Sequence, residues 1–235
     1  NRVRYLVIDV LDRKEIENFF SNNRIDVLVN LSARAGVTES IADPRTNFET
    51  NVVGNFNLLD SARLYGVKKF VFASTGGAIM GDAEPPLTEN MRPNPLTPYG
   101  VSKLTCELYT KVFEQCYSIN SCCLRFSNVY GEYSIHKNNL IPAFLKSAFD
   151  RATACLYGDG GQARDFIYVG DLTEGIARVI DRNATGVIQL ATGVSTTALG
   201  VVKLIEERLP PEIRMNWENK PARKGEVYST WCDNS

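Results

Sequence analysis

Along the chain, short apolar runs rich in β-branched residues alternate with stretches in which apolar residues recur every three to four positions. The first pattern is typical of a buried strand and the second of one face of a helix. They predict strands at Arg4–Asp9, Val27–Leu31, Lys69–Ser74 and Ser121–Phe126, each followed by a helix, at Arg13–Asn22, Pro44–Tyr65, Tyr99–Tyr117 and Asn139–Asp150. This order predicts an α/β fold in which helices cover a parallel sheet.

From about residue 127 onward the apolar runs become shorter. They predict strands at Ala154–Tyr157, Phe166–Val169 and Val187–Leu190, and helices near Asp171–Asp181 and Thr197–Arg208. We therefore expect one domain over residues 1–126 and a smaller α/β lobe over residues 127–235, with some elements of the lobe returning to the first sheet.

The charge balance narrows the kinds of partner. Lysine and arginine number 26 and aspartate and glutamate 27, with no run of like charge, so we expect neither nucleic acid nor an anionic membrane as a partner. No apolar stretch approaches the roughly 20 residues that span a bilayer, which favours a cytoplasmic protein. Six cysteines without C-x-x-C spacing and a single histidine predict reduced core cysteines and no metal site.

A candidate catalytic pair lies at the start of the helix Tyr99–Tyr117. In the string Tyr99-Gly-Val-Ser-Lys103 the phenol and the ammonium are four positions apart and share one helix face. A cation held there lowers the pKa of the phenol and makes Tyr99 a usable proton acceptor. Taken alone, the pattern also fits a pair of solvated surface side chains.

Hydroxyl groups end the preceding strand. Ser74 and Thr75 come just before Gly76 and Gly77, at the carboxyl edge where ligands bind in open α/β sheets. A hydroxyl there can bind a substrate oxygen and relay its proton to the phenolate. The alternative is that Ser74 and Thr75 only cap a turn.

These motifs and others downstream resemble the UDP-glucose 4-epimerases, members of the NAD-dependent epimerase/dehydratase family of extended short-chain dehydrogenases/reductases. The resemblance rests on the order and spacing of Phe70–Gly81, Tyr99-x-x-x-Lys103, Arg125–Gly131, Tyr157–Gly160, Arg164–Val169 and Pro221–Glu226. It implies a Rossmann-type, doubly wound parallel sheet that binds NAD, a smaller lobe that binds a nucleotide sugar, and a homodimer.

The resemblance assigns roles residue by residue. It makes Tyr99 the catalytic base, Lys103 the residue that lowers its pKa and holds the nicotinamide ribose, and Thr75 the hydroxyl of the proton relay. Further cofactor contacts are expected at Asp9, Val10, Leu31, Ser32, Ala33, Asn51, Ser74 and Phe126. Besides Thr75 and Tyr99, substrate contacts are expected at Asn128, Asn139, Leu140, Arg164, Arg223, Glu226 and Thr230.

Thr230 bears on the choice of sugar. In the family, a bulky tyrosine at the matching position shuts an N-acetyl group out of the sugar pocket. The smaller threonine implies that UDP-N-acetylhexosamines are accepted beside UDP-hexoses. The alternative is that Thr230 faces the core.

The sequence departs from the family at several places. Asn30 and Met80 stand where members usually have histidine and tyrosine. The glycine-rich G-x-x-G-x-x-G loop, whose backbone N–H groups approach the pyrophosphate, is not found. Because Asn1 leads almost at once into an apolar run, we expect a fragment that lacks the first two strands of the sheet. If the chain existed only as given, NAD binding should be severely impaired.

Gly76 and Gly77 bear on the reaction. Dehydratases and decarboxylases of this superfamily place acidic residues directly after the strand-end hydroxyl. Glycine has no side chain to move a proton, so simple 4-epimerisation is favoured. The alternatives are an NDP-sugar 4,6-dehydratase or reductase, and a non-catalytic sugar-nucleotide-binding protein.

Overall fold

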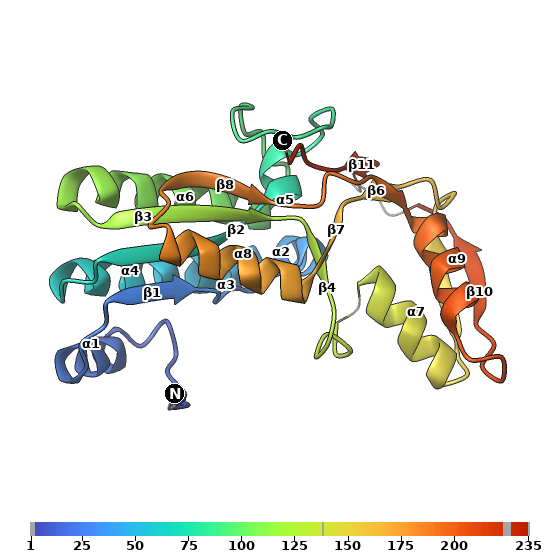
Figure 1. The fold of residues 1–235 in the computed structure, drawn as a ribbon, viewed down its shortest axis with the longest axis horizontal. Helices are drawn as coiled ribbons and strands as arrows, with labels where there is room; N and C mark the ends of the chain where they lie inside the picture. Colours follow the sequence, from blue (N-terminus) through green and yellow to red (C-terminus); the bar gives the residue numbers. More distant parts are fainter. Residues whose placement is uncertain (1–2, 138, 223–226, 235) are drawn as a thin grey trace. The chain divides into compact units, whose positions relative to one another are not determined.

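The computed structural model describes residues 3–137, 139–222 and 227–234, and the chain divides into two compact units (Figure 1). The first comprises Asn1–Gly81, Arg92–Arg125 and Ile176–Ile188, and the second Asp82–Met91, Phe126–Gly175 and Gln189–Ser235. Each unit therefore takes up a segment from the other half of the sequence. A functional division at residue 126 stays a prediction.

The first unit is built on a four-stranded sheet. Its strands, in spatial order, are β1 (Val27–Asn30), β2 (Lys69–Thr75), β3 (Asn120–Phe126) and β8 (Gly186–Leu190). β1 and β2 pair in parallel, with Val27 opposite Lys69. Six of the seven residues of β2 are buried, as expected for a parallel strand covered on both faces.

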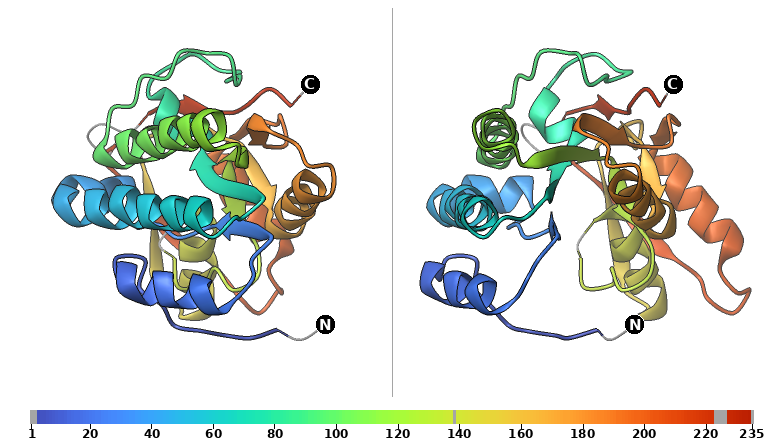
Figure 2. Two further views of the ribbon diagram at one scale, coloured as in Figure 1. Left: turned by 90° about the vertical axis from the view of Figure 1, so that its left-hand side faces the viewer. Right: turned by 60° about the vertical axis from the view of Figure 1, so that its left-hand side comes forward.

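Helices lie on both faces of this sheet, as in a doubly wound fold (Figure 2). One face carries α1 (Arg13–Asn22), α4 (Gly54–Leu64) and α6 (Pro98–Tyr117). The other carries the end of α8 (Val169–Asp181), whose residues from Ile176 onward belong to this unit. Phe70 and Phe72 of β2 share a core cluster with Leu59 of α4 and Phe113 of α6. The predicted α/β fold is confirmed. The unit also contains the short helices α2 (Val37–Ala42), α3 (Pro44–Phe48) and α5 (Gly76–Met80).

The strand expected at Arg4–Asp9 is not formed. These residues have no regular secondary structure, and Tyr5 and Val7 are 90% and 98% exposed. A strand requires a hydrogen-bonded neighbour, and within the described ranges no second strand pairs with this segment. The prediction was wrong because an apolar, β-branched run indicates strand propensity but does not supply a partner.

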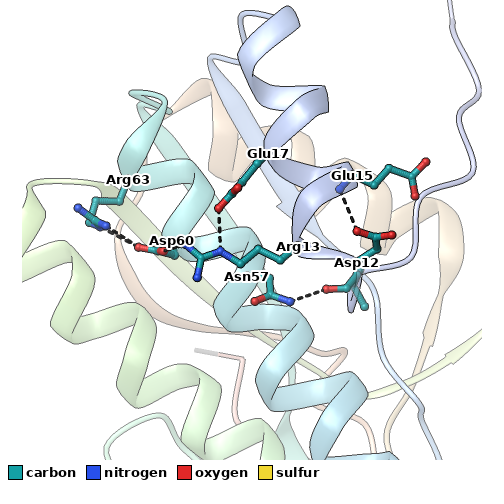
Figure 3. A network of polar contacts seen from close by, with 8 residues as sticks. Asp12, Arg13, Glu15, Glu17, Asn57, Asp60 and Arg63 are labelled. Carbon is teal, nitrogen blue, oxygen red and sulfur yellow. Dashed lines mark hydrogen bonds and ion pairs between the residues drawn. The ribbon is translucent and has the colours of Figure 1, made fainter.

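α1 is nevertheless fixed to the rest of the first unit. Ile16 and Phe20 are buried in the core cluster. Figure 3 shows Arg13 of α1 between Glu17, at 2.7 Å, and Asp60 of α4, at 3.8 Å. Because Arg13 is 62% exposed, these ion pairs are screened by solvent, and apolar burial holds the helix in place.

The single helix predicted for Pro44–Tyr65 is interrupted by a π-helical turn, η1 (Glu49–Val53), between α3 and α4. Such turns are common at functional sites. Gly54 follows directly, and a Cβ on it would lie 2.6 Å from Cγ2 of Val10. Glycine therefore lets the turn at Asp9 and Val10 approach the start of α4.

The second unit has shorter elements around its own core. Phe144 of α7, Leu156 of β5 and Val202 of α9 form the buried cluster. Its strands pair as β10–β5, β4–β7 and β11–β6–β9. The elements are β4 (Asn128–Tyr130), α7 (Leu140–Phe149), β5 (Thr153–Tyr157), β6 (Ala163–Arg164), β7 (Phe166–Tyr168), β9 (Thr196–Thr197), α9 (Ala198–Arg208), β10 (Asn216–Lys220) and β11 (Ser229–Thr230).

The structure bears on the cysteines and on the search for membrane spans. Cys122 and Cys123 of β3 are buried and unpaired, as expected of reduced core cysteines. Within the described residues, no helix combines the length and the apolar character needed to cross a membrane.

Candidate active site

The start of α6 carries the predicted catalytic pair. The Thr97 hydroxyl accepts a hydrogen bond from the backbone N–H of Gly100 at 3.2 Å, and Pro98 occupies the first turn. Both features favour a helix start at this point. The four-residue spacing then directs Tyr99 and Lys103 toward the carboxyl end of β2.

Tyr99 is hydrogen-bonded to Thr75, the last residue of β2. Burial raises the pKa of the Tyr99 phenol to about 12, while the hydrogen bond from Thr75 lowers it. The structure thus brings together a hydroxyl and a phenol in the arrangement that a proton relay needs. With that pKa the phenol is protonated at neutral pH, so its use as a base requires a nearby cation.

Lys103 supplies a buried cation. It is 3% exposed, and its ammonium lies 6.0 Å from the centre of the Tyr99 ring. Burial lowers the pKa of Lys103 to about 8, and interactions with Cys106 and Glu107 raise it. Most Lys103 side chains are therefore charged at pH 7, and the predicted lowering of the Tyr99 pKa by this charge stays a prediction.

Gly100 sets how closely α6 approaches α5. A Cβ on Gly100 would lie 2.2 Å from the carbonyl oxygen of Ala78. We expect Gly100→Ala to lower the free energy of unfolding by about 1–3 kcal/mol through overpacking, measured by urea denaturation. Gly200→Ala is the matched control, since Gly200 also follows a threonine cap but a Cβ there would meet only side-chain atoms of Thr196 and Thr197. Equal stability of the two variants would contradict this packing argument.

The segment after β1 is held by a pair of buried asparagines. Oδ1 of Asn30 accepts hydrogen bonds from the backbone N–H and the hydroxyl of Ser32, at 3.0 and 2.6 Å. The Asn30 amide donates to Oδ1 of Asn55 at 2.8 Å. Three predicted cofactor residues lie in this segment. Ser32 is hydrogen-bonded to Asn30, Leu31 is 58% exposed, and Ala33 is half-buried. Asn55 was missed by the sequence analysis.

Asn51 connects this segment to α6. Its Oδ1 accepts from the backbone N–H of Arg34 at 2.7 Å, and its amide donates to Oγ of Ser102 at 3.0 Å. Ser102 in turn donates to the carbonyl oxygen of Tyr99 at 2.8 Å. The Asn51 side chain therefore positions backbone on both sides of the site, and its direct contact with a cofactor stays a prediction.

The predicted adenine-side residues form an anchored turn. The Asp9 carboxylate accepts a hydrogen bond from the backbone N–H of Leu11 at 2.9 Å. The carbonyl oxygen of Val10 accepts one from the Asn57 amide of α4, also at 2.9 Å. This turn is thereby fixed against the helix, in the same unit as Tyr99 and Lys103.

Two buried polar groups fit the nicotinamide ribose of the implied NAD. Ser74 is 4% exposed, and its hydroxyl has no hydrogen-bond partner among the described residues. The Lys103 ammonium has three protons, and among the described residues it donates to the carbonyl oxygen of Ala73, at 2.7 Å. Unused donors and acceptors of this kind suit sugar hydroxyls. Phe126, the remaining predicted contact, is the half-buried last residue of β3.

The second unit contains a cavity of about 440 Å³. Four predicted substrate residues line it: Asn128 of β4, Asn139 and Leu140 at the start of α7, and Arg164 of β6. Its wall contains both polar and apolar side chains, and its size suits a small ligand. The structure therefore brings these four residues together.

Arg164 is largely engaged with backbone. Its Nη1 donates to the carbonyl oxygens of Ala163 and Tyr228, at 2.8 and 3.0 Å, and its Nη2 donates to that of Val227 at 2.7 Å. The guanidinium thus fixes the chain just before β11.

The other predicted substrate residues are not placed in the cavity. Thr230 of β11 is half-buried and pairs with Arg164 across the β11–β6 ladder, but it is not among the residues that line the cavity. Arg223 and Glu226 lie outside the described residues. Their assignments remain predictions.

Comparison with known proteins supports the resemblance. Residues 1–191 match the NAD dependent epimerase/dehydratase family. A putative UDP-glucose 4-epimerase of Methanocaldococcus jannaschii is 32% identical over 238 residues, which cover 99% of this chain and 76% of that protein.

Two solved structures share the fold. The UDP-glucose 4-epimerase of Thermus thermophilus, in complex with NAD, has a TM-score of 0.90 and 32% identity, covering 96% of this chain and 75% of that one. A dTDP-glucose 4,6-dehydratase of Streptomyces venezuelae has a TM-score of 0.88 and 28% identity, covering 99% and 71%. Both reaction types therefore occur on this fold.

Proposed function

This chain belongs to the NAD-dependent epimerase/dehydratase family, whose cofactor is NAD, and we propose that it is a nucleotide-sugar 4-epimerase acting on UDP-hexoses or UDP-N-acetylhexosamines. The observation that carries the proposal is the hydrogen bond between Thr75 and Tyr99 beside the buried ammonium of Lys103. A protein that only bound the nucleotide sugar would have no need of this arrangement.

In the proposed reaction, Thr75 binds the C4 hydroxyl of the sugar and Tyr99, as phenolate, receives its proton. Lys103 stabilises the phenolate by its charge. Bound NAD, with its ribose held by Ser74 and Lys103, would supply a reversible hydride acceptor for C4. The 4-keto sugar rotates between the oxidation and the reduction of C4. The hydride therefore returns to the opposite face of C4, and Tyr99 returns the proton to the C4 oxygen. No atom is gained or lost.

A 4,6-dehydratase is the second candidate, favoured by the likeness to the Streptomyces dehydratase. Elimination of water requires an acid and a base near C5 and C6 of the sugar. Here Thr75 is followed by Gly76 and Gly77, which open α5 and have no side chain that could transfer a proton. This local sequence supports the epimerase.

We assign the nucleotide to the second unit, where the cavity between β4, α7 and β6 has the size for a small ligand. Asn128, Asn139 and Leu140 line it, and Arg164 adds a positive charge suited to a diphosphate.

The test is to incubate the full gene product with NAD and UDP-galactose. We expect UDP-glucose as the product. A 4-keto-6-deoxy sugar would instead identify a dehydratase, and binding without turnover would identify a non-catalytic binding protein.

Thr230 provides a prediction about the sugar. If it opens the pocket to an acetamido group, Thr230→Tyr should lower kcat/KM for UDP-N-acetylglucosamine relative to UDP-glucose, by about 10-fold or more, since overpacking costs about 1–3 kcal/mol. Ser229→Tyr, one residue away on β11, is the control. An unchanged ratio in Thr230→Tyr would show that Thr230 is not the gate.

The exposed faces of α4 and α6 support a homodimer as part of the proposal. Phe56, Leu108 and Val112 are 37%, 57% and 49% exposed on these helices, whereas Phe113 points into the core. We expect a dimer mass in light scattering at micromolar concentration, and a monomer for Leu108→Glu/Val112→Glu. A monomeric unsubstituted protein would refute the dimer.

A further inference from the structure

Glu107 lies four residues after Lys103 on α6 and forms a buried ion pair with Arg125 of β3. The Arg125 Nε and Nη2 atoms lie 3.0 and 2.8 Å from the two carboxylate oxygens of Glu107, and the side chains are 4% and 6% exposed. Replacing such a pair by apolar residues of similar volume is often neutral or stabilising. Fold stability is therefore a weak reason for its presence.

The neighbours of Lys103 offer a stronger reason. Among the described residues, Cys106 and Glu107 are the two groups whose charge acts on Lys103. Burial raises the pKa of the Cys106 thiol to about 12, so this thiol is neutral wherever Lys103 is charged.

The other groups that lie against the ammonium are neutral as well. Burial raises the pKa of Tyr99, whose ring centre lies 6.0 Å from the ammonium, to about 12. From β2, the ring of Phe72 and the carbonyl of Ala73 face Lys103, and neither is charged. Glu107 is thus the one anion that acts on Lys103 among the described residues, one helical turn away on α6, and Arg125 is the cation that holds its carboxylate.

We propose that the Glu107–Arg125 pair keeps Lys103 charged, with Arg125 fixing the Glu107 carboxylate at one helical turn from the ammonium. Glu107 and Arg125 are positioning residues, which act on Tyr99 through Lys103. The effect of this charge on Tyr99 rests on the proposed function. The effect of the pair on the charge of Lys103 does not.

The direct test is the titration of Lys103 in the full gene product, followed by NMR of isotope-labelled lysine without cofactor or substrate. The informative variant is Glu107→Leu/Arg125→Met, which removes both charges and keeps the volume. The second variant is Glu107→Gln. It removes the negative charge but keeps an amide oxygen that can accept a hydrogen bond from Arg125. Lys69 is an internal control, since it is buried on the neighbouring strand β2 but donates to Asn120 and the carbonyl of Ala184.

We expect the titration midpoint of Lys103 to fall by about one unit in either variant, with Lys69 unchanged. At pH 8 the charged fraction of Lys103 would then fall from about one half to about one tenth. In turnover assays the alkaline limb of kcat should move to lower pH by the same amount.

An unchanged Lys103 midpoint in a folded variant would overturn the proposal and leave the pair a structural contact. If the unsubstituted protein showed no epimerase activity but the Lys103 midpoint moved as expected, the proposed function would fail and this inference would stand.

Discussion

Tyr99→Phe is expected to lower kcat for 4-epimerisation by at least about 10²-fold in the full gene product. The substitution removes only the phenol oxygen, which is hydrogen-bonded to Thr75. The C4 hydroxyl then has no proton acceptor. The burial of the ring is retained, so folding and nucleotide binding should be nearly unchanged.

Tyr109→Phe is the matched control for this experiment. Tyr109 lies on the same helix, is 42% exposed and contacts Phe56 edge to face. Its hydroxyl has no part in the proposed relay, so kcat should stay near that of the unsubstituted protein. A Tyr99→Phe variant that turned over at a similar rate would show that another group is the base.

Arg125→Met is expected to lower the free energy of unfolding by about 3–5 kcal/mol. The variant leaves the Glu107 carboxylate buried without its bidentate partner, and an unpaired buried charge is strongly unfavourable. Urea denaturation measures the loss. Glu107→Leu/Arg125→Met should recover most of it, because neither charge then remains in the core.

The control is Arg24→Met, which removes the ion pair between Arg24 and Asp26. Because the Arg24 side chain is 80% exposed, this variant should leave the free energy of unfolding almost unchanged. Equal losses in Arg125→Met and in the double variant would mean that the arginine stabilises the fold by packing, and the charge argument would be wrong.

The sequence predicted the helices and buried strands of this fold well where the signal is local. The apolar spacing indicated helices at Pro44–Tyr65 and Tyr99–Tyr117, and the structure has α4 ending at Leu64 and α6 spanning Pro98–Tyr117. The run Arg4–Asp9 shows the limit, because an apolar pattern says nothing about whether a neighbouring strand is present.

The placement of the candidate catalytic residues could be predicted for the same reason. Tyr99 and Lys103 share one helix face through local spacing, and Thr75 ends a strand at the ligand-binding edge of the sheet. The asparagines at positions 47, 51 and 55 recur every four residues, a signal that could have indicated a buried polar face. The partners of Asn47 and Asn51, Arg34 and Ser102, are set by tertiary contacts that no local pattern indicates.

The roles of Arg223 and Glu226, the cytoplasmic location and the division into a cofactor and a substrate domain remain predictions. Arg223 and Glu226 lie outside the described residues. The location and the functional roles of the two units depend on measurements of the protein in the cell and with its ligands. The proposed chemistry depends on none of them, because Thr75, Tyr99 and Lys103 all belong to the first unit.

The most direct test of the proposed chemistry is the fate of deuterium placed at C4 of UDP-galactose. If C4 is oxidised and reduced through NAD, UDP-glucose formed by the full gene product in ordinary water should keep the deuterium at C4. Replacement of the label by solvent hydrogen, or a product that has lost water from C5 and C6, would contradict the account.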